Sequence, residues 1–235
     1  MRTKRTVEKQ WKSLAGMAGV VIASILCSML LLMITGWIPK SMIRESCVES
    51  GAYFEEHELF PLLLEGQFNT RQDNYADCIL VNILYHIDKK DLLRSLIKAS
   101  YYNPELQSVE VSLAESLAGD KTPDVDYFRY WHGGMVLLRP LFVFMGIRGT
   151  RIILGVVLLL LTLTVIALMW KQKAKTLAVC YFLGNVIIQT WMCAFSIEYI
   201  TTFLLMNIFL ILLLLWFPHR TDTGSFYRRV YARLC

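Results

Sequence analysis

Four long apolar runs constrain this chain of 235 residues more than any other feature. They cover Leu14–Trp37, Ile152–Trp170, Thr176–Phe195 and Tyr199–Phe217, and none contains a charged residue. A helix needs about 20 mostly apolar residues to cross the hydrocarbon core of a bilayer, and a soluble core helix rarely has an uncharged run of this length. The runs therefore predict an all-α, polytopic membrane protein with four transmembrane helices.

The first run follows a basic start, so it has to be distinguished from a secretory signal peptide. The apolar core of a signal peptide is about 7–15 residues long, and this run is well beyond that length. We therefore expect a retained membrane anchor; cleavage after the run is the alternative.

The distribution of charge predicts how the chain is oriented. Residues 1–12, the linker 171–175 and the tail after 217 together carry 12 basic and two acidic residues, whereas segment 38–150 carries 11 basic and 16 acidic residues. Positive charge in short flanking segments favours the cytoplasmic side. Both termini and the linker are predicted to be cytoplasmic, and segment 38–150 and the turn near Glu198 to be outside.

These features divide the chain into six predicted parts, the largest of which is a helical extracytoplasmic domain between the first and second spans. The 13-residue apolar stretch Met135–Ile147 is too short to span and contains Arg139-Pro140, which is typical of a re-entrant or interfacial segment. The parts are a basic N-terminus 1–13, span 14–37, the extracytoplasmic domain 38–133, the re-entrant or interfacial segment 134–151, spans two to four in 152–217, and a basic tail 218–235.

Within the outer domain, local signals predict two helices. Asp73-Asn74 is typical of a helix start, and the apolar periodicity that follows extends from Tyr75 to Ser100, with a break at 88–91. Asn103-Pro104 predicts the start of a second helix, which ends at Gly119.

Cys47 and Cys78 are the two cysteines of the outer domain, where an oxidising environment permits a disulfide. A Cys47–Cys78 bridge is a candidate, and two free thiols are the alternative. Neither cysteine has the spacing of a zinc ligand.

The sequence DNYAD places two carboxylates, Asp73 and Asp77, four residues apart. On one helix face they are suited to bind a divalent metal with a diphosphate, or to act as a general base. The alternative is that Asp73 caps the helix and Asp77 is a solvated acid of the first turn, which the helix dipole favours.

His132 precedes two glycines, so its backbone can approach a ligand closely. With Arg129 and Arg139 it forms a candidate site for a phosphate or a sugar. A lone arginine in an apolar run usually pairs or reaches the headgroups, so snorkelling to lipid phosphate is the alternative for Arg139. Glu198, also on the outer side, is a candidate partner for Arg139 or Arg148.

No phosphate-binding loop, zinc-protease motif, hydrolase elbow or dinucleotide fingerprint occurs. The basic residues are accounted for by topology, so nothing indicates nucleic-acid binding.

The stretches QDNYADCILVN and YFRYWHGGMVLLRPLFVFMGIRGTRII resemble the N-terminal part of an uncharacterised bacterial family of polytopic membrane proteins, whose plan is similar to that of GT-C glycosyltransferases. Those enzymes take sugars from polyprenyl-phosphate carriers and use an essential acid of a large outer loop. The resemblance implies that Asp77 is the catalytic base, that Asp73 contacts metal or substrate, and that His132 and Arg139 contact the donor phosphate. Such enzymes usually have eight or more spans, whereas this chain has four predicted ones.

The sequence is consistent with three functions. The first is a glycosyltransferase, or its N-terminal portion, that uses a polyprenyl-phosphate-linked sugar outside the membrane in cell-envelope polysaccharide assembly. The second is a non-catalytic membrane partner or assembly factor with a protein-binding outer domain. The third, a transporter component, is disfavoured because no span contains a charged residue.

Overall fold

The computed structural model describes residues 2–216 apart from 105–106 and 129–132. Within these ranges the regular structure is entirely helical, and extended pairing is limited to the isolated bridges Leu62–Arg71 and Tyr101–Val125. The all-helical prediction is confirmed for this part of the chain.

Two helices are long and apolar enough to cross a membrane. They are the Ser13–Gly36 part of α1 (Arg2–Gly36), with 24 residues, and α7 (Ile147–Lys171), with 25. The two remaining apolar helices, α8 (Lys175–Ile187) and α9 (Ile200–Trp216), are shorter, with 13 and 17 residues. Among the described residues, helix length therefore supports two of the four predicted spans.

The predicted span Thr176–Phe195 is interrupted rather than continuous. Helix α8 ends at Ile187, Gln189 has a φ of 54°, and the chain continues as the 3-10 helix η3 (Thr190–Ala194). The Thr190 hydroxyl donates to the Asn185 side-chain oxygen over 2.9 Å, which closes this turn. Hydrophobicity alone does not predict such an interruption, because the residues on both sides of it are apolar.

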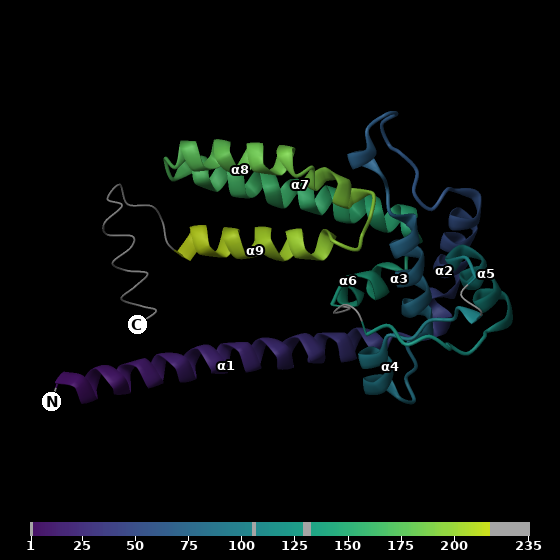
Figure 1. Ribbon diagram of the computed structural model, residues 1–235, viewed down its shortest axis with the longest axis horizontal. Coiled ribbons are helices and arrows are strands. Elements are labelled where there is room, and N and C mark those ends of the chain that lie inside the picture. The colour runs from purple at the N-terminus through teal and green to yellow at the C-terminus, as the bar shows by residue number, and fades with distance from the viewer. Residues whose placement is uncertain (1, 105–106, 129–132, 217–235) are drawn as a thin grey trace.

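Helices α7, α8, η3 and α9 pack together in a bundle (Figure 1). A Cβ on Gly155 of α7 would lie 2.7 Å from the Cβ of Ala194, so glycine allows η3 to approach α7 closely. The Tyr181 hydroxyl of α8 donates to the Asn207 side-chain oxygen of α9 over 2.6 Å, which joins those two helices. Helix α1 makes its main contacts with α4 and α6 instead.

The segment between α1 and α7 forms a small helical domain at one end of the long helices (Figure 1). Its helices are α2 (Lys40–Glu56), η1 (Phe68–Thr70), α3 (Asn74–His86), α4 (Leu92–Lys98), α5 (Val109–Gly119) and α6 (Met135–Leu141). Helices α2, α3 and α5 pack against one another, and α2 also packs against α7.

The local predictions for this domain are mostly confirmed. Asp73 caps α3 by accepting a hydrogen bond from the Ala76 N–H over 2.8 Å, α3 and α4 are separated near the predicted break, and α5 ends at Gly119. The start of α5 was predicted wrongly. Helix α5 begins at Val109, with Ser108 at its N-cap position, and Asn103 lies before it, where its side-chain oxygen accepts from the Ser112 hydroxyl over 2.8 Å.

One hydrophobic core joins the domain to the bundle. It includes Phe54 and Leu84 from the domain, Leu154 from α7, Ile197 from the turn before α9, and Ile200 at the start of α9. Because such a core is continuous, the domain is held rigidly on the ends of α7 and α9.

Candidate functional site

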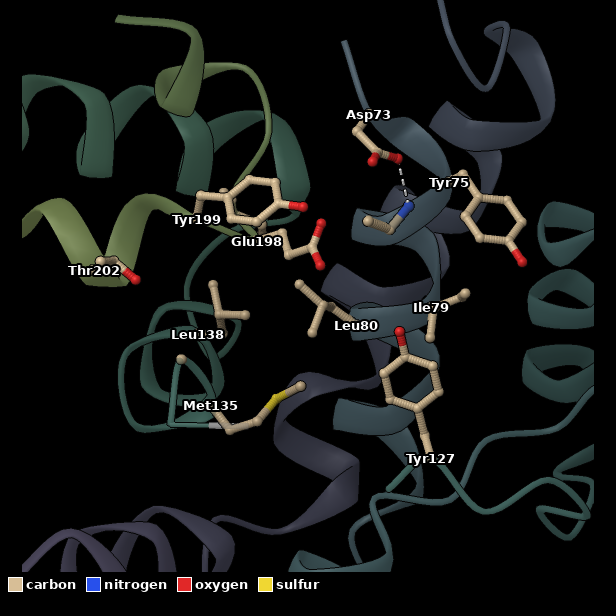
Figure 2. A pocket seen from close by; sticks show the side chains of 13 residues that line it. Asp73, Tyr75, Ile79, Leu80, Tyr127, Met135, Leu138, Glu198, Tyr199 and Thr202 are labelled. Atoms are coloured by element: carbon tan, nitrogen blue, oxygen red, sulfur yellow. Dashed lines mark hydrogen bonds between the residues drawn. The ribbon is translucent and has the colours of Figure 1, made fainter. Parts of the chain in front are cut away.

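A cavity of about 410 Å³ lies where the domain meets the bundle (Figure 2). One wall is the face of α3, and the other consists of α6 and the first residues of α9. Within the second wall, α6 and α9 are in close contact: a Cβ on Gly134 would lie 3.2 Å from the Thr201 hydroxyl. The lining residues are Asp73, Tyr75, Ala76, Ile79, Leu80, Tyr127, Gly134, Met135, Leu138, Ile197, Glu198, Tyr199 and Thr202.

The cavity has an apolar floor and a polar, aromatic rim. Leu80, Met135 and Leu138 extend into the space between the walls, and the Glu198 carboxylate points into it from the side opposite α3 (Figure 2). Asp73 lies at the upper edge, with one oxygen engaged in capping Ala76. An apolar pocket with a few convergent polar groups is the usual form of a small-molecule site.

The described lining contains carboxylates and hydroxyls but no lysine, arginine or histidine. In the part of the chain that the structure describes, no group of three His, Cys, Asp or Glu side chains is placed to hold a metal ion. Asp73 and Glu198 by themselves are therefore suited to hydrogen-bond hydroxyl groups or to accept a proton.

Asp77, predicted to be the catalytic base, does not line the cavity and is completely buried. One of its oxygens accepts from the Arg151 guanidinium over 2.7 and 3.0 Å, and the other accepts from the Ile197 N–H over 2.9 Å. The alternative that Asp77 is a solvated first-turn acid is wrong, because the carboxylate is buried and hydrogen-bonded inside the protein. Its role as a base stays a prediction.

Arg151 connects α7 with two other helices. Besides Asp77, it donates to the Asn74 side-chain oxygen over 2.7 Å and to the Tyr53 hydroxyl over 3.2 Å. The Asn74 amide in turn donates to the Glu58 carbonyl over 2.7 Å. Every polar group of this buried cluster therefore has a partner, which is the condition under which a buried ion pair is tolerated.

The cluster fixes one edge of the cavity. Ile197, held by Asp77, is the residue directly before Glu198, and the Ser196 hydroxyl donates to the Asp73 carbonyl over 3.3 Å. Burial raises the pKa of Asp77 to about 7, although Arg151 and the Ile197 N–H both favour its charged form. Asp77 is thus a positioning residue for the turn that carries Glu198.

Arg139, predicted to contact donor phosphate or lipid, is also completely buried and lies outside the cavity lining. Its guanidinium donates to the carbonyls of Leu84 and Ile38 over 2.6 and 2.7 Å, and more weakly to Ile87 over 3.5 Å. These carbonyls belong to the last turn of α3 and to the residues that follow α3 and α1. Burial lowers the pKa of Arg139 to about 10, so it stays charged at neutral pH.

Of the other residues predicted to bind substrate, some line the cavity and some do not belong to the described part of the chain. Asp73 and Glu198 line the cavity together, whereas Arg129 and His132 lie outside the described residues. Arg148, a predicted partner of Glu198, forms an ion pair with Glu49 at 3.7 Å.

Several residues around the site carried a weak sequence signal or none. Arg151 stands at the boundary of an apolar run, where a basic residue is ordinary, so its buried pairing could not be recognised. Tyr199 and Thr202 fall within the predicted transmembrane run Tyr199–Phe217. The predicted turn near Glu198 indicated the part of this wall that precedes α9, and the predicted re-entrant segment 134–151 contains the part that α6 supplies.

The Cys47–Cys78 disulfide is absent: both cysteines are free, buried thiols. The Cys78 thiol donates to the Val109 carbonyl over 3.4 Å, and Cys47 lies in the core of the domain. Burial raises the pKa of Cys47 to about 12 and that of Cys78 well above its usual value.

These thiols are expected to be unreactive in the folded protein, because the thiolate is the reactive form. In detergent micelles, iodoacetamide should leave Cys47 and Cys78 unmodified until the chain is unfolded in SDS, with or without reductant. Peptide mass spectrometry would measure the modification at each residue. A peptide pair that separates only after reduction would contradict the free-thiol state.

No protein-family model, curated protein or solved structure matches this chain.

Proposed function

We propose that this chain is a four-span membrane protein with cytoplasmic termini and an outer helical domain. The charge distribution supports this orientation, and α1 and α7 are of spanning length. Helix α8 together with η3, and α9, would supply the two other crossings. The cavity would then lie at the outer membrane surface, because it contains the residues that begin α9.

We further propose that the protein is a glycosyltransferase of the GT-C type, or the N-terminal portion of one, that uses a polyprenyl-phosphate-linked sugar. The observation that carries this proposal is the cavity itself, in which Glu198 and Asp73 face a common space between the outer domain and the apolar helices. A lipid-linked sugar combines a polyol head with a long apolar tail. A cavity with acidic and hydroxyl groups above an apolar floor matches that combination.

In this proposal Glu198, rather than Asp77, is the general base. It accepts the proton of an acceptor hydroxyl while that oxygen attacks the anomeric carbon and the polyprenyl phosphate leaves. Asp73 binds sugar hydroxyls with its second oxygen. Arg129 and His132 remain the proposed contacts of the donor phosphate.

Glu198→Gln is the variant that tests this assignment. In nanodiscs supplied with a polyprenyl-phosphate-linked hexose and envelope glycan acceptors, the wild-type chain should release polyprenyl phosphate, measured by mass spectrometry. The glutamine variant is expected to lose at least about 100-fold of this rate, the usual contribution of a general base, at an unchanged melting temperature. Glu115→Gln, an exposed glutamate on α5, is the matched control and should keep the full rate.

The alternative, a non-catalytic membrane partner or assembly factor, gives a different result. Release of polyprenyl phosphate would then be absent from the wild-type chain, and Glu198→Gln would have no effect. A stoichiometric membrane protein that co-purifies with the wild-type chain would establish that alternative.

A further inference from the structure

The loop between α2 and α3, residues 57–73, presents large apolar side chains on its outer surface. Phe60, Leu62, Leu64 and Phe68 are between 38% and 77% exposed. Exposed apolar residues are ordinary when they are scattered, but four within nine residues form a concentrated patch. We call these four residues the apolar loop patch.

The patch is held in place by the loop's own hydrogen bonds. The Leu63 N–H donates to the Thr70 carbonyl over 3.0 Å, and the Leu64 N–H donates to the Thr70 hydroxyl over 3.1 Å. The Gln72 N–H donates to the Pro61 carbonyl over 2.9 Å. A defined backbone therefore keeps these side chains outside the domain core.

The base of the loop is fixed beside the turn that joins α8 to α9. The Asn74 N–H donates to the Leu59 carbonyl over 2.9 Å, and the adjoining Asp73 carbonyl accepts from Ser196. In Figure 1 the loop, drawn in dark blue, rises from the domain near the ends of α7 and α8. The apolar loop patch is thus attached at the level where the apolar helices begin.

The same level carries other exposed aromatic side chains. Trp191, Phe195 and Tyr199, around the α8–α9 turn, are 40% to 56% exposed. Trp37 directly follows α1, and Phe144 lies three residues before α7; both are also exposed. Aromatic residues near the ends of apolar helices on one side of a protein are typical of a membrane–water interface.

We infer that the apolar loop patch inserts into the outer interfacial layer of the bilayer that surrounds α7 to α9. Arg71, the bridge partner of Leu62, is exposed and supplies a cation for a lipid phosphate. Four exposed glutamates, Glu55, Glu56, Glu58 and Glu65, oppose anionic headgroups, so zwitterionic lipid is the matching partner. The inference depends on the proposed orientation of the chain but not on transferase activity.

Photocrosslinking in nanodiscs of phosphatidylcholine tests this inference on the full chain. Phe68 is replaced by p-benzoylphenylalanine, a similar side chain, and Leu64 is replaced in a second variant. The control carries the same group at Glu115, which is exposed on α5. After irradiation, mass spectrometry should find the loop peptides bound to phosphatidylcholine at several times the yield of the control.

Equal lipid adducts at the loop and control positions would overturn the inference, and so would no adduct at either loop position. Crosslinking in intact membranes to another protein, in place of lipid, would also overturn it and would identify the patch as a protein-binding surface. The rate of polyprenyl phosphate release is measured separately, so a loss of that activity does not affect this result.

Discussion

Asp77→Asn is expected to lower the free energy of unfolding by about 3–5 kcal/mol, the usual cost of removing one partner of a buried ion pair. The asparagine leaves the Arg151 guanidinium buried without a counter-charge, and an arginine cannot discard its proton to escape that cost. It also weakens the bond to the Ile197 N–H, which now faces an amide instead of a carboxylate. Unfolding by SDS in mixed micelles would measure the loss.

A double-mutant cycle separates the ion pair from other effects of the substitution. Asp77→Leu with Arg151→Met removes both charges, so the double variant should be more stable than the sum of the two single losses predicts. Additive losses would show that the two side chains do not interact. Asp73→Asn is the matched control, since asparagine caps a helix as well as aspartate does.

Hydrogen exchange at the Ile197 amide measures the local effect of Asp77→Asn. The Ile197 amide should exchange faster in the variant, because the acceptor that protects it is weakened, while peptides from the far end of α9 should be unchanged. If the Ile197 amide kept its protection, Asp77 would not position the turn that carries Glu198.

Arg139→Met is expected to cost about 2–6 kcal/mol, which is about 1–3 kcal/mol for each of the two short hydrogen bonds to buried carbonyls. The methionine fills much of the same volume but leaves the carbonyls of Leu84 and Ile38 without this donor. These carbonyls lie near the C-terminal ends of α3 and α1, where the helix dipoles favour a positive charge. The same SDS titration would measure the effect.

Arg139→Lys is the matched variant, because it keeps the charge and loses the fork of donors. A single ammonium group is expected to recover only part of the stability, since a guanidinium presents several donors in a fixed arrangement. If Arg139→Met were as stable as the wild-type chain and yet bound no polyprenyl phosphate, Arg139 would return to the substrate-binding role.

The helices of the domain between α1 and α7 could be predicted well because their signals are local. Asp73 was recognised as a cap from the residues next to it, and Gly119 marked the end of α5 in the same way. The interruption within the apolar segment Thr176–Phe195 could not be predicted in the same way. The break before η3 depends on how Asn185 and Thr190 pair, and their identities alone do not specify it.

The candidate site was predicted only in part, for a physical reason. The sequence singled out Asp77 and Arg139 as candidate site residues, but their partners are 74 residues away in one case and backbone carbonyls in the other. Backbone carbonyls have no sequence signature, and a distant arginine at the start of an apolar run is ordinary. Asp73 and Glu198, which line the cavity, were identified from the helix start and from the predicted topology.

The partners of Asp77 also determine when this domain can reach its final form during synthesis. Asp77 accepts from Ile197, which is 120 residues further along the chain. The ribosome therefore produces the whole domain, α7 and α8 before the last partner of this carboxylate exists. The first turn of α3 can therefore complete its hydrogen bonds only after the turn before α9 has been synthesised. Contacts of such long sequence separation are associated with slow folding, because a long loop has to be closed to form them.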